Sequence, residues 1–207
     1  MSELCRLGIL ISGSGTNLEN IAVAIEEHGL PAHIAVVISD VEDAFGLVRA
    51  RKHGIDAVFV DWDSFPDRAA YDRELIRILE GNEVDLVVLA GYMRLVGTGF
   101  VEAFRNRIMN IHPALLPSFP GTSGVSDALA YGVKVSGVTV HFVDEGLDTG
   151  PIILQDAVPV LPEDDEDTLH QRIHGVEYRL YPQAIRYFCE GRLRVEGRLV
   201  RILEKET

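Results

Sequence analysis

Short apolar runs alternate with longer amphipathic segments along the first half of the chain. The runs are rich in Val, Ile and Leu and are bounded by glycine or polar residues, which is typical of buried strands. They cover residues 7–11, 34–38, 57–60, 86–89 and 108–111. The segments between them carry an apolar face at helical spacing and predict helices at 18–25, 44–53, 66–80 and 99–104. Apolar strands that alternate with helices indicate a mainly parallel sheet with helices on both faces.

The second half of the chain is patterned differently. Residues 135–143 and 152–160 form two long β-branched runs with polar interruptions, and a helix is predicted at 165–190. The acidic run 164–167 favours the start of this helix, where negative charge is stabilised, and a metal site is the alternative interpretation. Residues 193–200 resemble a small hairpin. We therefore predict an α/β fold of one domain, 1–207, with a Rossmann-like, mainly parallel sheet and an antiparallel C-terminal extension.

Composition narrows the range of functions. The chain has 207 residues, of which 47% are hydrophobic, and this suits one globular domain. Its 19 Lys and Arg against 32 Asp and Glu give a net charge of −13, which argues against general binding to nucleic acid or to a membrane surface. No apolar run approaches the length of a membrane span, and no signal peptide is evident. Cys5 and Cys189 are expected to be reduced thiols, so we expect a cytoplasmic protein.

Residues 12–17, Ser-Gly-Ser-Gly-Thr-Asn, join the first predicted strand to the first predicted helix. Glycines let the backbone approach a ligand, and the amides at a helix N-terminus favour a phosphate. The loop is not a Walker loop, and Leu18 stands where a dinucleotide fingerprint would have its third glycine. The alternative is a tight turn with Thr16 or Asn17 as the N-cap. The loop alone supports both interpretations.

Three polar residues offer the chemistry of acyl transfer. Asn110 and His112 lie at i and i+2 near the end of a predicted strand, so their side chains point the same way at the edge where open α/β sheets bind ligands. Asp148 lies on a glycine-flanked loop between the two long runs. Together a carboxylate, an imidazole and an amide can orient a proton carrier and stabilise an oxyanion. The alternatives are a core histidine and an Asx-turn aspartate.

Two further features are less specific. The other histidines show no metal-ligand spacing, and they stand at positions 28, 33, 53, 141, 170 and 174. His170 and His174 lie at i and i+4, which favours a solvated helix face. The apolar loop 90–96 after the fourth strand could line a pocket for a flat heterocycle, or it could be a buried connection.

Four motifs resemble the glycinamide ribonucleotide (GAR) formyltransferase family of purine synthesis in residue type, order and spacing. They are found at 11–18, 90–94, 110–117 and 141–151, so the resemblance covers nearly the whole chain. It implies an enzyme that transfers the formyl group of 10-formyltetrahydrofolate to the amine of glycinamide ribonucleotide. The expected products are formylglycinamide ribonucleotide and tetrahydrofolate. The resemblance implies no metal, no nucleic-acid partner and no membrane, and a homodimer is compatible with it.

The resemblance also implies roles for individual residues. Asn110, His112 and Asp148 would be catalytic, with Asp148 holding His112 as an imidazolium. The ribonucleotide would contact Gly15, Thr16, Asn17 and Glu177. The folate would contact Arg68, Met93, Arg94, Leu95, Val96, Asn110, Asp144 and Asp148. The phosphate-binding half would then be 1–105, and the catalytic and folate-binding half 106–207. One departure is the stretch 122–126, since several members carry a histidine just after the preceding Pro-Gly.

Rival functions make different demands on the chain. A methionyl-tRNA formyltransferase would need a further C-terminal RNA-binding domain and a basic surface, and a formyltetrahydrofolate hydrolase would usually carry an N-terminal regulatory domain. We expect neither here. A non-catalytic nucleotide-binding module could use the loop 12–17 but would not need Asn110, His112 and Asp148 together. A formyl-transfer assay with and without glycinamide ribonucleotide discriminates between these functions.

Overall fold

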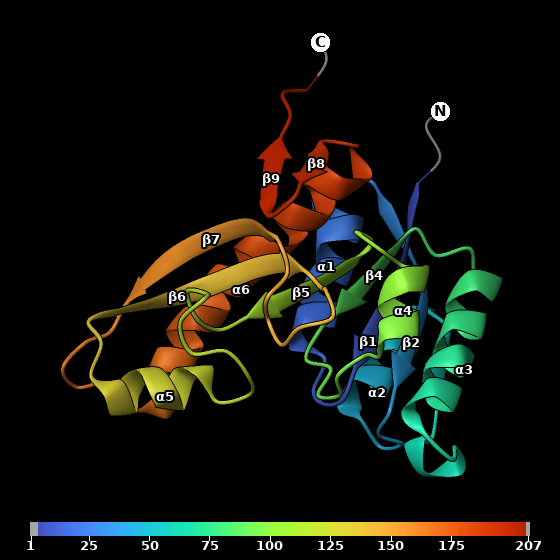
Figure 1. Ribbon diagram of the computed structural model, residues 1–207, viewed down its shortest axis with the longest axis horizontal. Helices are drawn as coiled ribbons and strands as arrows, with labels where there is room; N and C mark the ends of the chain where they lie inside the picture. The colour runs from blue at the N-terminus through green and yellow to red at the C-terminus, as the bar shows by residue number, and fades with distance from the viewer. Residues whose placement is uncertain (1–3, 206–207) are drawn as a thin grey trace. The chain divides into compact units, whose positions relative to one another are not determined.

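The computed structural model describes residues 4–205 and divides into two compact units between Met109 and Asn110. The division falls within strand β5 (Ile108–His112), and Figure 1 shows the elements of both units. Within the described residues no helix is long and apolar enough to cross a membrane.

The first unit alternates strands with helices, as predicted. Its elements are β1 (Cys5–Ile11), α1 (Thr16–His28), β2 (Ala32–Ser39), α2 (Phe45–Lys52), β3 (Ala57–Phe59), the 3₁₀ helix η1 (Trp62–Ser64), α3 (Arg68–Gly81), β4 (Leu86–Leu89) and α4 (Thr98–Ala103). The strands are parallel and lie in the order β3-β2-β1-β4. The N–H of Val87 in β4 donates to the carbonyl of Arg107, just before β5. The expected parallel sheet is confirmed here.

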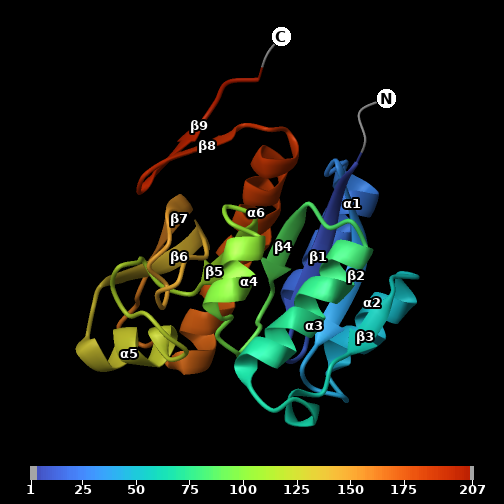
Figure 2. The same ribbon diagram turned by 45° about the vertical axis from the view of Figure 1, so that its right-hand side comes forward.

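The strand order reverses at β1. The chain moves outward from β1 to β3 and then returns to place β4 on the other side of β1. Because such crossovers are right-handed, α1 and α2 cover one face of the sheet and α3 and α4 the other. Figures 1 and 2 show these two pairs, and each pair is in contact. The loops after β1 and β4 therefore open at a switch point, the usual place for a ligand in such sheets.

The second unit is built around a curved antiparallel pair. It continues β5 and contains α5 (Gly124–Tyr131), β6 (Val135–Phe142), β7 (Ile152–Pro159), α6 (Glu166–Cys189), β8 (Leu193–Glu196) and β9 (Leu199–Ile202), with strand order β5-β6-β7-β9-β8. Strands β6 and β7 are antiparallel, as are β8 and β9. Helix α6 packs against β6 and β7. The predicted antiparallel C-terminal extension is confirmed.

Some elements differ from the sequence-based expectation. Helix α5 was not predicted, although Val125 and Ala128 form a short buried face at helical spacing. Helix α3 begins at Arg68 rather than at residue 66, because the Asp67 carboxylate accepts the N–H of Ala70 and caps the helix there. Helix α6 begins after Asp165, whose side chain forms a capping box with Thr168. The interpretation of the acidic run as a helix start is thus confirmed.

Candidate active site

Asn110 and His112 point to the same side of β5, as their i, i+2 spacing predicts, and His141 lies beside them on β6. Asn110 Nδ2 is 3.3 Å from His141 Nε2. The other ring nitrogen, His141 Nδ1, is 2.9 Å from the Phe142 carbonyl, which can only accept, so Nδ1 carries the proton. Burial lowers the pKa of His141 and keeps its ring neutral. His141 Nε2 therefore accepts an N–H from Asn110 and fixes which end of that amide faces the ring.

His112 is buried, with its two ring nitrogens directed at oxygen atoms. Nε2 lies 2.7 Å from the carbonyl of Phe119, and Nδ1 lies 3.5 Å from Oδ2 of Asp148. The second distance is longer than a hydrogen bond but short enough for an ion pair. Gly124 makes room for the ring, since a Cβ there would lie 3.2 Å from His112 Nε2. The first residue of the unpredicted helix α5 thus shapes the histidine's surroundings.

Asp148 is held by a glycine-rich loop between β6 and β7. Its φ of 52° is left-handed, a conformation that Asp and Asn tolerate better than most residues. Its Oδ2 accepts the N–H of Gly121 at 2.7 Å, and its Oδ1 lies 3.7 Å from His141 Nε2. The Asp148 carboxylate therefore faces both histidines, and the sequence-based pairing of Asp148 with His112 matches the geometry.

Asp144, at the start of the same loop, acts on the loop itself. Its Oδ1 accepts the hydroxyl of Thr149 at 2.6 Å and the N–H of Gly146 at 3.1 Å. Gly150 closes the loop, because any side chain there would collide with the carbonyl of Phe142. The carboxylate of Asp144 thus shapes the turn that presents Asp148, which is a role that the sequence pattern did not indicate.

A buried hydroxyl fastens the segment that follows His112. Thr139 Oγ1 donates to the carbonyl of Ala114 at 2.7 Å and accepts the N–H of Leu116 at 3.0 Å. Gln155 Nε2 completes the cluster at 2.9 Å from both Thr139 Oγ1 and the Leu116 carbonyl. Strands β6 and β7 therefore fix the position of the chain directly after Asn110 and His112.

In the first unit, the loop 12–17 is packed against the start of α2. Helix α1 begins at Thr16 with Gly15 as its N-cap at φ 71°, so the expected N-cap at Thr16 or Asn17 is wrong. A Cβ on Gly15 would lie 2.6 Å from the Gly46 Cα, and the Gly46 N–H donates to the Gly13 carbonyl. Gly15 is thus required by backbone conformation and close packing. The loop still presents the N-terminus of a helix, which favours an anion.

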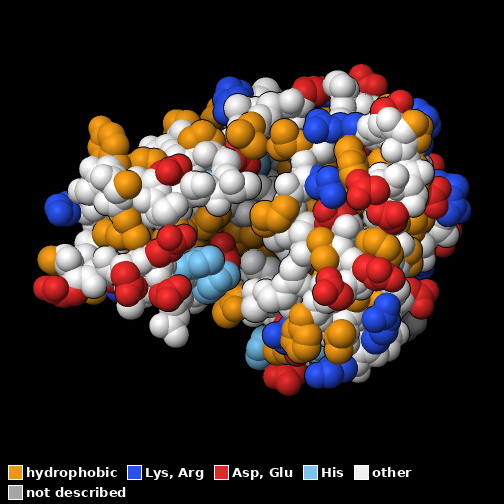
Figure 3. Space-filling model, turned by 90° about the horizontal axis from the view of Figure 1, so that it is seen from below, with side chains coloured by type: hydrophobic (Ala, Val, Ile, Leu, Met, Phe, Trp, Pro, Cys, Tyr) orange, Lys and Arg blue, Asp and Glu red, His pale blue; other side chains and the backbone are white. Residues whose placement is uncertain are grey.

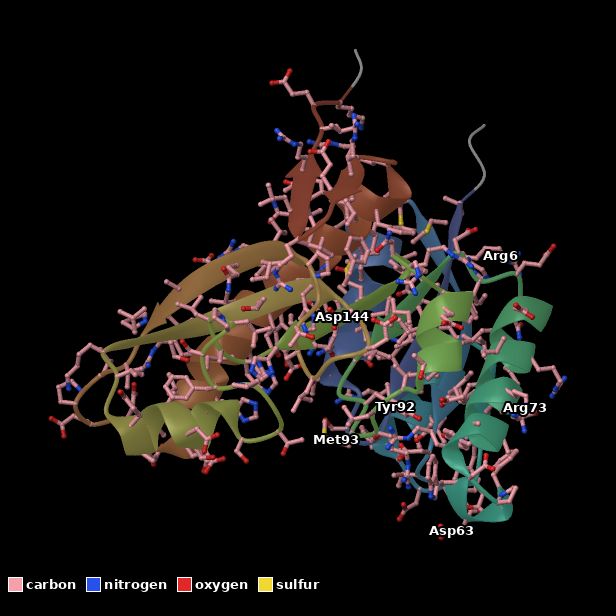
Figure 4. All side chains as sticks on the ribbon, viewed as in Figure 1. Arg6, Asp63, Arg73, Tyr92, Met93 and Asp144 are labelled. Carbon is pink, nitrogen blue, oxygen red and sulfur yellow. The ribbon has the colours of Figure 1, made fainter. Side chains whose placement is uncertain are left out.

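The loop 91–97 after β4 is fastened at several points. Figure 4 shows Tyr92 and Met93 on this loop. The Tyr92 hydroxyl is hydrogen-bonded to that of Tyr71 on α3, and burial raises the pKa of Tyr92. The Gly97 N–H donates to Asp72 at 2.8 Å, and burial raises the pKa of that carboxyl. Met93 and Leu95 are exposed, while Arg94 and Val96 are partly buried. Apolar side chains on a fixed backbone suit a flat ring.

The two remaining predicted residues lie on helices. Arg68 is exposed at the start of α3. Glu177 is buried on α6, and its Oε2 lies 2.8 Å from Nδ1 of His174, which raises the pKa of His174. His170 is exposed, as a solvated face predicts, whereas His174 is partly buried and paired with Glu177. No group of three or more His, Cys, Asp or Glu side chains within residues 4–205 is arranged to hold a metal ion.

Comparison with known proteins identifies the family. A family model described as formyl transferase matches residues 5–185, a stretch that includes every predicted site residue. The chain belongs to the formyl transferase family. It is 43% identical over 187 residues to phosphoribosylglycinamide formyltransferase of Escherichia coli (strain K12), covering 90% of this chain and 88% of that protein.

Other members of the formyl transferase family extend this likeness. The crystal structure of glycinamide ribonucleotide transformylase 1 from Symbiobacterium toebii has a TM-score of 0.96 and 55% identity, covering 99% of this chain and 96% of that one. The trifunctional purine biosynthetic protein adenosine-3 of Drosophila pseudoobscura pseudoobscura is 47% identical over 191 residues, but this chain spans only 14% of its length. The resemblance to phosphoribosylglycinamide formyltransferases seen in the sequence motifs is confirmed.

Sequence reasoning missed one member of the polar cluster. His141 begins the 141–151 motif and shows no metal-ligand spacing, but no contact with Asn110 was expected of it. The sequence pattern gave one indication of a role for His141, because His141 stands near the carboxyl end of a predicted strand, as His112 does. What the sequence could not indicate is that β6 lies beside β5 and so brings His141 to Asn110.

Proposed function

We propose that this chain transfers the formyl group of 10-formyltetrahydrofolate to the amine of glycinamide ribonucleotide, giving formylglycinamide ribonucleotide and tetrahydrofolate. The observation that carries the proposal is the cluster of Asn110, His112 and Asp148 in the second unit. It occurs in a chain that matches the formyl transferase family over residues 5–185. Formyl transfer needs an oxyanion stabiliser and a proton carrier, and this cluster contains both.

Asn110 and His112 would stabilise the developing negative charge. Attack of the neutral substrate amine on the formyl carbon gives a tetrahedral oxyanion. One N–H of the Asn110 amide is directed to His141, which leaves the other for the oxyanion. The His112 ring has oxygen acceptors at both nitrogens, an arrangement that suits the doubly protonated imidazolium. Its positive charge would then balance the oxyanion, and the interaction would be strong because the His112 ring is buried.

Asp148 would keep His112 charged and take part in proton movement. The attacking amine must lose a proton, and the folate nitrogen must gain one before it leaves. A carboxylate beside His112, with its position fixed by the Gly121 N–H, favours the imidazolium that can supply that proton. His141 is a positioning residue in this scheme, since it contacts Asn110 and faces Asp148.

We assign substrate binding to the residues that the sequence motifs indicated. Gly15, Thr16 and Asn17 offer helix N-terminal amides to the ribonucleotide phosphate. Glu177, a buried carboxyl group whose Oε2 lies 2.8 Å from Nδ1 of His174, suits the glycinamide end. The folate would contact the fixed loop with Met93, Arg94, Leu95 and Val96, together with Arg68, Asn110, Asp144 and Asp148. Cys5 and Cys189 form no disulfide, in keeping with a cytoplasmic reaction. A homodimer stays a prediction.

The reaction itself is the first test. The purified chain, given 10-formyltetrahydrofolate and glycinamide ribonucleotide without added metal, should form formylglycinamide ribonucleotide, and a chelator should not slow it. Product is measured by mass spectrometry and tetrahydrofolate by absorbance. Tetrahydrofolate release that proceeds equally well without the amine substrate would indicate a hydrolase and would contradict the proposal.

A further inference from the structure

Asp40 is a nearly buried carboxylate between two loops to which the proposed function gives different substrates. It directly follows β2, and its side chain is only 5% exposed. β2 lies beside β1, and β1 beside β4, so the carboxyl ends of these three strands are neighbours. Asp40 is not one of the residues proposed to contact either substrate.

Each oxygen of Asp40 accepts a short hydrogen bond from a different loop. Oδ1 accepts the hydroxyl of Ser12, in the loop 12–17, at 2.6 Å. Oδ2 accepts Nε–H of Arg94, in the loop 91–97, at 2.6 Å. The Arg94 guanidinium also lies over the ring of Trp62, 4.5 Å from its centre. Charge-assisted bonds of this length are among the stronger ones in proteins.

Ser12 connects the two loops directly as well. Its hydroxyl oxygen accepts the N–H of Met93 at 2.9 Å, and its own N–H donates to the carbonyl of Gly91 at 3.1 Å. With its hydroxyl proton given to Asp40, the Ser12 oxygen presents a lone pair to Met93. The Asp40 carboxylate thus sets the hydroxyl orientation that holds the second loop to the first.

We propose that Asp40 is a positioning residue that keeps the ribonucleotide loop 12–17 and the folate loop 91–97 in register, so that binding of both substrates depends on it. The inference rests on the proposed function for the identity of the two substrates. A carboxylate is suited to this task because both of its oxygens only accept. An amide offers one acceptor, and Arg94 can only donate, so an asparagine would satisfy one loop less well.

The test is a set of steady-state measurements with each substrate varied in turn. Asp40→Ala should raise KM for glycinamide ribonucleotide and for 10-formyltetrahydrofolate by roughly ten-fold each, while kcat changes less. Asp40→Asn, which keeps the shape, should raise both by about three-fold. Arg94→Met removes the hydrogen bond between Asp40 and the folate loop, and it should raise only the folate KM. The Asp40→Ala and Arg94→Met changes each remove the same hydrogen bond, between Arg94 and Asp40. In the double variant the folate KM should therefore be no higher than in the worse single variant.

Asp43→Ala is the matched control. Asp43 is an exposed acid in the same β2–α2 connection as Asp40, and its removal should leave both KM values unchanged. Melting temperatures of all variants distinguish a loss of stability from a change in the relative positions of the two loops. The inference is overturned if folded Asp40 variants leave either KM unchanged, or if they lower only stability and kcat. Wild-type chain that makes no formylglycinamide ribonucleotide would instead overturn the proposed function, and the coupling of its two substrates with it.

Discussion

Asp148 combines a left-handed backbone with a side chain that faces two histidines, and this decides which variant tests it. Asparagine tolerates the same conformation, so Asp148→Asn should keep the loop and the substrate affinities. It removes the negative charge that favours the His112 imidazolium, so kcat should fall by roughly 100-fold. Single-turnover kinetics with both substrates saturating measures the effect.

The partnership of His112 and Asp148 has its own readout. Residues that act as one unit give non-additive losses, so a His112→Ala, Asp148→Asn double variant should lose less activity than the product of the single losses. His112 contributes in this scheme only when its charge is maintained. Losses that multiply would mean that the 3.5 Å approach of the two side chains has no catalytic consequence.

Glycine is required at position 15 for structural reasons, and the resulting loss of stability in a variant can hide an effect on phosphate binding. The positive φ of Gly15 and its contact with Gly46 predict that Gly15→Ala destabilises the protein by roughly 1–2 kcal/mol or more. Gly13 lies in the same loop, but its φ is not positive and a Cβ there would meet nothing within 4 Å. Gly13→Ala should therefore unfold close to the wild-type temperature. Equal losses of melting temperature in the two variants would contradict this account.

At the scale of elements, His53 at the end of α2 connects that helix to α1 through contacts with two glutamates. Its Nδ1 lies 2.8 Å from Glu26 and its Nε2 3.3 Å from Glu19, and Arg49 also contacts Glu19. The hydrogen bond to Glu26 is the main cause that raises the pKa of His53 above its ordinary value. Because the pKa is raised in the folded state, the stabilisation is fully present below a pH of about 6.5 and is lost as pH rises through the folded pKa.

His53→Gln keeps a neutral donor but cannot be charged, and it tests this connection. The melting temperature of the wild type should exceed that of the variant most at a pH of about 6, and the difference should shrink towards a pH of about 9. Thermal unfolding of both proteins across this range provides the measurement. A difference that stays constant with pH would show that the charge on His53 does not contribute.

At the scale of the whole molecule, the net charge of −13 opposes the approach of a phosphorylated substrate. Figure 3 shows acidic side chains at many separate places on the face drawn, with basic ones among them. Recognition of the phosphate must then be short-range, through groups such as the helix N-terminus at Thr16. Raising the ionic strength from about 0.01 M to about 0.15 M should leave KM for the ribonucleotide unchanged or lower it. A KM that rises steeply with salt would indicate long-range attraction.

The sequence by itself determined the alternation of elements and the nature of the chemistry. Buried strands such as β4 (Leu86–Leu89) were predictable because an apolar run with turn residues on both sides has few other stable environments. Asn110 and His112 could be placed on one side of β5 because the strand period is local. The left-handed caps at Gly29 and Gly132 follow the same local logic, although the helix that ends at Gly132 was missed.

Only the tertiary structure decided which distant groups meet. His141 contacts Asn110, and Asp40 joins Ser12 to Arg94. Both contacts depend on strand order, which is a non-local property set by crossover connections rather than by the pattern within any strand. Helix α5 was missed because its buried face is short, and its packing on α6 supplies what its own sequence does not. Local patterns fix elements, whereas packing between elements fixes the partners of each polar group.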